Sequence, residues 1–236
     1  GSEMCIRDRD TGCRKKISIV CTIEDAYEKD AFATAAAEMA RFDALEKKAG
    51  YHDELAETLT IAADHFLAYR QSTGLMTVLA GLPWFTDWGR DTMIALTGLT
   101  LATGRYQDAR DILTTFARYV HHGMVPNMFP DEGTAPLYNT ADASMWYFYA
   151  VGKYLDYTGT PEDYAFVQET IYPKLKEIIA AYEHGTDFSI YMEEDGLIHA
   201  GSGLDQVTWM DVRVGDWVAT PPVSYTHLTL PTNSRV

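Results

Sequence analysis

Apolar side chains recur along most of the chain at the spacing of an α-helix. Residues 23–48 are rich in Ala, Glu and Lys, and the apolar residues of the next segment keep helical spacing. These apolar residues are Leu55, Leu59, Ala62 and Phe66. The pattern predicts a helix over residues 23–48, followed by a second helix with one apolar face.

Further helices are predicted where the same spacing ends at glycine. Residues 91–103 precede Gly104, residues 106–122 precede Gly123, and residues 140–157 form another helical stretch. The inward face of the 106–122 helix is Ala109, Ile112, Leu113, Phe116 and Val120. Such short links between helices favour tight helical hairpins.

One more helix has the clearest start signal. Thr160 is an N-cap residue, Pro161 suits the first helical position, and acidic side chains follow in the first turn. The predicted apolar face is Tyr164, Val167, Ile171, Leu175, Ile178 and Tyr182. Pro173 within this pattern predicts a kink or a break.

Strand patterns are sparse. Residues 15–22 alternate weakly, and residues 189–200 read as two short strands around the turn Glu194-Asp195-Gly196. Neither builds a sheet domain. We therefore expect an all-α fold of helical hairpins arranged around an axis, with the functional site on the longer loops at one end.

Composition and charge exclude several classes of partner. With 34 acidic and 19 basic residues the net charge is −15, and no basic stripe could follow a phosphate backbone. No apolar run approaches the length of a membrane span. We expect no nucleic acid and no membrane partner. The three cysteines, Cys5, Cys13 and Cys21, lack metal-ligand spacing, so we expect free thiols in a reducing, cytoplasmic compartment.

The two ends of the chain can be read from one DNA element on opposite strands. Residues 4–8 can be encoded by ATG TGT ATA AGA GAC, whose reverse complement encodes Val-Ser-Tyr-Thr-His, the sequence at 223–227. The element looks like the end sequence of a transposon used in library preparation. We expect residues 1–10 and 223–236 to be an assembly artefact without native structure, and the true coding sequence to continue past Pro222.

The longer loops combine aromatic rings with carboxylates. They comprise residues 81–90, 123–139 and 201–220, and the first contains the stretch GLPWFTDWGR. A sugar ring presents apolar C–H faces and a rim of hydroxyls, so its site needs Trp or Tyr platforms and polar partners such as Asp, Arg and Asn. These loops therefore predict a carbohydrate site.

The motifs WFTDWGRDT, YNTADASMW and TWMDVRVGDW, in this order, resemble the amylo-α-1,6-glucosidase domain of glycogen debranching enzymes. The resemblance runs from about residue 17 to residue 221 and implies an (α/α)6 toroid similar to glucoamylases. It implies that residues 23–222 are the N-terminal part of this domain, with about six helices, roughly half of the ring. Residues 11–22 would be the remnant of a preceding β-rich domain.

The resemblance also implies an activity, the inverting hydrolysis of α-1,6-linked glucose at a trimmed branch point of an α-glucan. No cofactor or metal is expected. Two alternatives stay open: a trehalase or glucoamylase of the same ring architecture, and a carbohydrate-binding remnant without catalysis. A truncated chain would itself be inactive.

Arg90 and Asp91 match the Arg-Asp pair that glucoamylase-like enzymes use to hold the terminal glucose. The alternatives are a surface ion pair for Arg90 and a favourable helix N-terminus for Asp91. Trp84 and Trp88 are candidate sugar platforms, and we expect one of them to be a platform and the other to fill the core. Asp87 is expected to orient Arg90 or a sugar hydroxyl, or to cap a turn.

Tyr138, Asn139 and Asp142 stand at the start of the 140–157 helix. Asp142 is the stronger candidate for the site, because Asn139 or Thr140 suits a helix cap. The pair His121-His122 suggests a metal site, but adjacent residues on a helix point apart. A favourable position at a helix C-terminus explains them better.

Asp211 matches the general acid of the family, and Trp209 beside it is a candidate for an apolar wall that favours a protonated carboxyl. Asp205 and Asp216 on the same loop are the rivals, and a further alternative is that Asp211 caps a short helix after it. The general base of the family lies near the end of the toroid, so none is assigned here.

Overall fold

The structure is a computed structural model that describes Arg9–Asp10, Lys16–Ile17, Val20 and residues 30–219, apart from Pro83 and residues 131–134. The chain divides into two compact units, residues 1–65 and 66–236. Strand β1 (Arg9–Asp10) pairs antiparallel with β2 (Lys16–Ile17) in the first unit. The remaining residues of the two expected assembly artefacts lie outside the described part of the chain.

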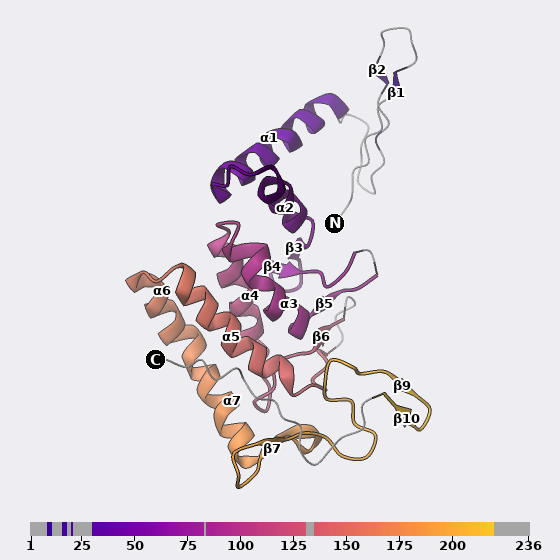
Figure 1. The fold of residues 1–236 in the computed structure, drawn as a ribbon, viewed down its shortest axis with the longest axis vertical. Coiled ribbons are helices and arrows are strands. Elements are labelled where there is room, and N and C mark those ends of the chain that lie inside the picture. The colour runs from indigo at the N-terminus through magenta and orange to yellow at the C-terminus, as the bar shows by residue number, and fades with distance from the viewer. Residues whose placement is uncertain are drawn as a thin grey trace. The chain divides into compact units, whose positions relative to one another are not determined.

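The first unit contains two helices in contact, α1 (Ala31–Ala49) and α2 (Glu54–Asp64) (Figure 1). The Asp30 carboxylate caps α1 by accepting from the backbone N–H groups of Phe32 and Ala33. Arg41 of α1 donates to Asp64 of α2 at 2.6 Å. The start predicted for the first helix, residues 23–29, lies outside the described residues.

The predicted apolar face of α2 is not buried. Leu55 is 67% exposed and Leu59 57% exposed, whereas Thr60, Ala63 and Asp64 are the buried residues. The helix also ends at Asp64, before Phe66. The spacing identified a helix correctly, but Leu55 and Leu59 of the predicted stripe are exposed.

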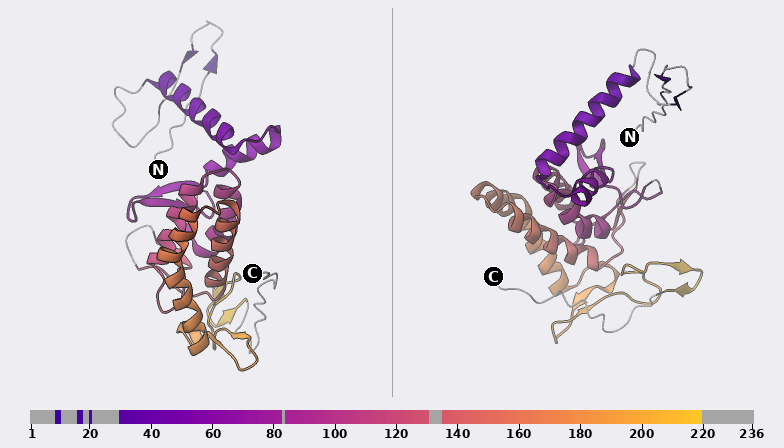
Figure 2. Two further views of the ribbon diagram at one scale, coloured as in Figure 1. Left: turned by 90° about the vertical axis from the view of Figure 1, so that its left-hand side faces the viewer. Right: turned by 45° about the horizontal axis from the view of Figure 1, so that its top comes forward.

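Helices are the main regular structure of the second unit, as the sequence predicts (Figures 1 and 2). Helix α3 (Gly89–Leu96) continues as a π-helical turn, η1 (Thr97–Leu101), and is followed by α4 (Tyr106–Arg118) and α5 (Asp142–Tyr157). Helix α3 lies beside α5, and α4 contacts α5 and η1. The predicted inward face of α4, from Ala109 to Val120, is buried in the core.

The last helical stretch consists of α6 (Pro161–Phe166), a π-helical turn η2 (Val167–Ile171) and α7 (Tyr172–His184). Thr160 forms the predicted cap as a reciprocal capping box with Asp163. The break expected at Pro173 is the π turn immediately before it, because proline has no N–H to donate to the preceding turn. Tyr164 is 56% exposed, so the prediction that it faces the core is wrong.

Short antiparallel strand pairs lie between the helices of the second unit, and only one of them was predicted. That one pairs β7 (Tyr191–Met192) with β8 (Ile198–His199), after a 3-10 turn, η3 (Asp187–Ser189). The others pair β3 (Leu67–Arg70) with β4 (Leu75–Val78), β5 (Asp87–Trp88) with β6 (Met128–Phe129), and β9 (Arg213–Val214) with β10 (Trp217–Val218). Strands this short carry too few residues for alternation to be recognised.

Two glycines permit close approaches between elements. A Cβ atom at Gly89 would lie 1.9 Å from the carbonyl oxygen of Pro126, so only glycine lets α3 begin against the 125–127 segment. Gly123 has φ +75°, and a Cβ there would lie 2.1 Å from that of Ala181 on α7. The start of α3 and the turn after α4 are thereby fixed.

No helix in the described part of the chain is long and apolar enough to cross a membrane.

Candidate active site

A hollow of about 240 Å³ lies where two segments of the second unit meet, residues 80–91 and 209–211. It is lined by Ala80, Phe85, Trp88, Arg90, Asp91, Trp209 and Asp211. Two indole rings, one guanidinium and two carboxylates therefore share one cavity. These five side chains, predicted for the site from their sequence motifs, come from stretches more than a hundred residues apart in the chain.

The β5–β6 pairing places the first half of this site. Trp88 pairs with Met128, and the N–H of Gly89 donates to the carbonyl of Asn127 at 2.8 Å. Helix α3 starts at once after this contact, so Arg90 and Asp91 occupy its first turn. The exposed Asp91 carboxylate is favoured there by the helix dipole and also lines the hollow.

Arg90 forms a buried ion pair with Asp142 of α5, and not the surface pair that was the alternative. Its Nε donates to Asp142 Oδ2 at 2.7 Å and its Nη2 to Oδ1 at 3.0 Å, and both side chains are 9% exposed. This leaves Nη1 without a partner among the residues that the structure describes. Asp142 does not line the hollow, so it acts on the site by holding the Arg90 guanidinium.

Asp87 does not orient Arg90, so that expectation is wrong. It is fully buried, and its carboxylate accepts from Arg70 at both oxygens and from Thr77 Oγ1 at 2.8 Å. Arg70 also donates to the carbonyls of Phe129 and Pro130. Sequence reasoning missed Arg70 because it lies in the unpredicted β3–β4 hairpin.

The three tryptophans proposed for the site from the sequence differ in exposure. Trp84 is 86% exposed, Trp209 is 66% exposed, and Trp88 is partly buried with its ring edge-on to Phe85. Neither Trp84 nor Trp88 fills the core, so the expectation that one of them would is wrong. Trp88 and Trp209 line the hollow, and Trp84 does not.

The 201–212 loop is anchored to the start of α5. Asn139 Nδ2 donates to the carbonyl of Gln206 at 3.2 Å, and the N–H of Ala141 donates to that of Val207 at 2.9 Å. With its side-chain amide oriented so that both the nitrogen and the oxygen have partners, Gln206 donates to the carbonyl of Asp211 at 3.1 Å. These contacts fix the backbone on both sides of Trp209.

The three loop aspartates have different surroundings. Asp205 accepts from the N–H of Ser202 at 2.9 Å and from its hydroxyl, which makes it a turn-capping residue. Asp216 is exposed in the turn between β9 and β10. Asp211 is the one that lines the hollow, and a hairpin rather than a helix follows it, so it caps no helix.

Tyr138 and Asn139 do not line the hollow. The Tyr138 hydroxyl donates to the carbonyl of Tyr119 at 2.8 Å, and burial raises the pKa of this phenol. The residue at the N-cap of α5 is Ala141, without a side-chain cap bond, so neither Asn139 nor Thr140 is the cap. Both bond to the Asn127 side chain instead: Asn139 Oδ1 accepts from it at 3.2 Å, and Thr140 Oγ1 donates to it at 3.4 Å.

His121 and His122 lie after the end of α4, which stops at Arg118 rather than at residue 122. Their rings stack with centroids 3.9 Å apart, so the expectation that they point apart on a helix is wrong. His122 faces Asp187 at 3.2 Å. Within the part of the chain that the structure describes, no three His, Cys, Asp or Glu side chains form a group that could hold a metal.

Comparisons with known proteins agree with this chemistry. The sequence model of the amylo-alpha-1,6-glucosidase family matches residues 61–224. The glycogen debranching enzyme of Saccharomyces cerevisiae is 29% identical over 210 residues, which cover 66% of this chain and 14% of the yeast enzyme. The chain thus spans a small part of that relative. The family match includes every residue that lines the hollow, and the chain belongs to the amylo-alpha-1,6-glucosidase family.

Proposed function

We propose that this chain is the N-terminal part of an inverting, exo-acting glycosidase domain that releases α-1,6-linked glucose from trimmed branch points of an α-glucan. The observation that carries the proposal is the hollow in which Asp211 lies with Arg90, Asp91 and two tryptophans. Indole faces suit the C–H faces of a pyranose, and the charged groups suit its hydroxyls.

Asp211 is proposed as the general acid. It is partly buried, and the exposed Trp209 lies two residues before it in the lining of the same hollow. A sugar bound against Trp209 would exclude water from the carboxyl and favour its protonated form, which can protonate the leaving oxygen. The rivals lack this setting, because Asp205 is held by Ser202 and Asp216 is in an exposed turn.

Arg90 and Asp91 are proposed to hold the terminal glucose. Asp142 occupies two guanidinium nitrogens of Arg90, which leaves Nη1 to donate to a sugar hydroxyl, and the Asp91 carboxylate can accept from a neighbouring one. Asp87, Tyr138, Asn139 and Asp142 support this arrangement indirectly, by positioning the strand, loop and guanidinium that line the hollow. Trp84 remains a candidate platform for a more distant sugar unit because of its exposure.

An inverting mechanism also needs a carboxylate that activates water, roughly 6.5–9.5 Å from the acid. We propose that this base, like the second half of an (α/α)6 toroid, lies in sequence beyond this chain. The isolated chain is then expected to bind sugar weakly and to hydrolyse nothing detectable. Turnover by the isolated chain would contradict this assignment.

The test is Asp211→Asn in the full-length enzyme, with Asp205→Asn and Asp216→Asn as matched controls on the same loop. Asp211→Asn should lower kcat by about 10²-fold or more, because a general acid contributes on that order, while the controls keep near-normal kcat. Near-normal turnover by Asp211→Asn would overturn the assignment.

A substrate panel separates the activities that the same fold supports. The proposal expects glucose release from phosphorylase limit dextrin, with the anomeric product inverted, and little release from trehalose or linear maltooligosaccharides. Preference for either of the latter would indicate a trehalase or a glucoamylase. Binding without turnover of any substrate would indicate a carbohydrate-binding remnant.

A further inference from the structure

Asn127 holds the start of α3 from outside the hollow of the candidate active site. The residue is 1% exposed and does not line that hollow. Its carbonyl accepts from the N–H of Gly89 at 2.8 Å, and its own N–H donates to the carbonyl of Leu137 at 2.7 Å. Gly89 is the first residue of α3, so the bond to Gly89 fixes where Arg90 and Asp91 lie in the hollow.

The side chain of Asn127 begins a run of hydrogen bonds that ends at Asp211. Asn127 Nδ2 donates to Asn139 Oδ1 at 3.2 Å, and Asn139 Nδ2 donates to the carbonyl of Gln206 at 3.2 Å. The side-chain amide of Gln206 in turn donates to the carbonyl of Asp211 at 3.1 Å. Asn127 and Asn139 therefore connect the start of α3 to the residue proposed as the general acid, across the two segments that line the hollow.

The run of bonds has a direction, because each asparagine donates with its nitrogen and accepts with its oxygen. Asn127 Oδ1 accepts from Thr140 Oγ1 at 3.4 Å, while Asn127 Nδ2 donates to Asn139. In Asn139→Asp the carboxylate could still accept from Asn127, but it would face the carbonyl of Gln206 as a second acceptor. This substitution keeps the shape of the side chain and breaks the run of bonds at the loop.

We propose that Asn127 and Asn139 are positioning residues, which set the distance between the general acid and the groups that hold the terminal glucose. The inference rests on the proposed function, in which Asp211 protonates the leaving oxygen while Arg90 and Asp91 bind the sugar. Proton transfer requires the acid to lie within hydrogen-bond reach of that oxygen, so a shift of the loop by about 1 Å slows this step.

Two substrates distinguish a displaced acid from a general loss of structure. The sugar oxygen that leaves at a branch point needs a proton, whereas fluoride leaves α-glucosyl fluoride as a weak base and needs little help from an acid. Asp211→Asn should therefore lower kcat on phosphorylase limit dextrin far more than kcat on the fluoride. A residue that positions Asp211 should show the same selectivity, and a residue that only stabilises the fold should not.

The test uses Asn139→Asp and the uncharged Asn139→Leu in the full-length enzyme. Each should lower kcat on limit dextrin by about tenfold, with KM nearly unchanged because the sugar contacts of α3 are intact, and kcat on the fluoride by less than about twofold. The loss should be smaller than that of Asp211→Asn, because the N–H of Ala141 still bonds to the carbonyl of Val207 on the loop, at 2.9 Å.

The double variant Asn127→Leu/Asn139→Leu tests whether the two residues act as one unit. Its kcat on limit dextrin should be no lower than that of the weaker single variant, because one broken link already frees the loop. Losses that multiply would show two independent roles and would contradict the proposal.

The matched control is Thr140→Val. Thr140 is 0% exposed and bonds to the same Asn127 side chain, but its bond lies beside the path to the loop and is not part of it. Thr140→Val should lower the urea midpoint and leave kcat on both substrates unchanged.

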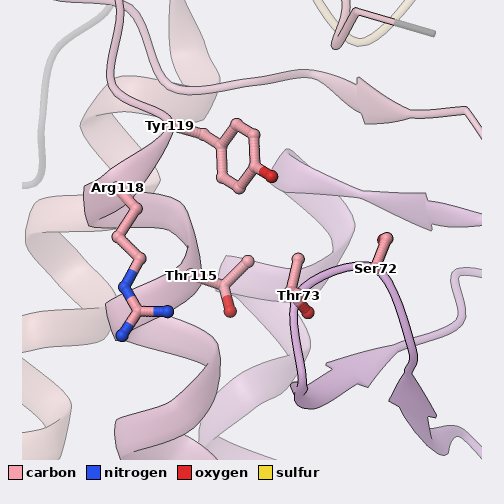
Figure 3. A pocket seen from close by; sticks show the side chains of 5 residues that line it. All are labelled: Ser72, Thr73, Thr115, Arg118 and Tyr119. Atoms are coloured by element: carbon pink, nitrogen blue, oxygen red, sulfur yellow. The ribbon is translucent and has the colours of Figure 1, made fainter. Parts of the chain in front are cut away.

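A second control lies away from the run of bonds. Ser72 is an exposed turn residue that lines a separate hollow of about 210 Å³, between the β3–β4 turn and the end of α4 (Figure 3). That hollow shares no lining residue with the hollow that contains Asp211. Ser72→Ala should change neither the urea midpoint nor kcat on either substrate.

The variants separate failure of this inference from failure of the proposed function. Near-normal kcat on limit dextrin in both Asn139 variants, with Asp211→Asn disabled, would overturn the inference and leave the proposed function intact. Equal losses on both substrates, or an equal loss in Thr140→Val, would show a structural role and also overturn it. Near-normal turnover of limit dextrin by Asp211→Asn would refute the proposed function, and this inference with it.

Discussion

Asp142→Asn tests the buried ion pair that holds Arg90. The substitution keeps the shape of the side chain but removes its charge, which leaves the Arg90 guanidinium buried without a counter-charge. Both side chains are 9% exposed and are joined by two hydrogen bonds, at 2.7 and 3.0 Å. Removal of one partner of such a pair is expected to cost about 3–5 kcal/mol of unfolding free energy.

The assay is urea unfolding of the chain at submicromolar concentration, followed by tryptophan fluorescence. All five tryptophans lie in residues 66–236, so the signal reports the unit that contains the ion pair. With a denaturant slope of about 2 kcal/mol per M, the midpoint should fall by about 1.5–2.5 M. The slope itself should not change.

The matched control is Asp156→Asn on the same helix. Asp156 is 63% exposed and pairs with Lys153, so its loss should cost less than about 1 kcal/mol. The double variant Arg90→Gln/Asp142→Asn should lose less than the sum of the two single losses, because no unpaired charge remains. A midpoint for Asp142→Asn equal to that of Asp156→Asn would refute the reasoning.

Three further predictions concern the site, the exposed faces and pH. In the full-length enzyme, Arg90→Ala and Asp91→Ala should each lower kcat/KM, and the loss of transition-state stabilisation that this reports should exceed the ~1 kcal/mol of an ordinary hydrogen bond. Near-normal kcat/KM in either variant would remove that residue from the site. The chain expressed alone should bind a hydrophobic dye and aggregate as its concentration rises, because large apolar side chains of α1, α2, α3 and α7 are exposed. A sharp, reversible thermal transition of a monomer would argue against this prediction. Asp163→Asn should destabilise the chain more at pH 7 than at pH 3, measured by urea unfolding at both values.

The sign of the Asp163 prediction follows from its surroundings. Burial raises the pKa of this carboxyl, but hydrogen bonds from Thr160 and Tyr154 outweigh burial and lower the pKa overall, below its usual 3.8. The unfolded chain therefore binds the proton more readily. The stabilisation is present above pH 3.8 and is lost as the pH falls through the lower folded-state pKa. An equal loss of unfolding free energy in Asp163→Asn at both pH values would contradict this prediction.

Helix positions, and the start of one helix, followed from local rules in the sequence. The inward face of α4 was predicted because a period of 3.6 residues needs no knowledge of the neighbours, and the Thr160 cap because its bonds lie within one turn. The stripe on α2 failed for the complementary reason. Spacing predicts which residues share a face, but whether that face is buried depends on what packs against it.

The sequence by itself determined the chemistry of the candidate site, since the aromatic and charged residues of the long loops already matched the needs of a sugar ring. Only the tertiary structure decided which of them meet. It paired Asp87 with Arg70 and Arg90 with Asp142, and it put Asp211 rather than Asp205 or Asp216 into the hollow. Ion pairs between distant segments depend on the packing of helices and hairpins, which no local pattern along the chain specifies.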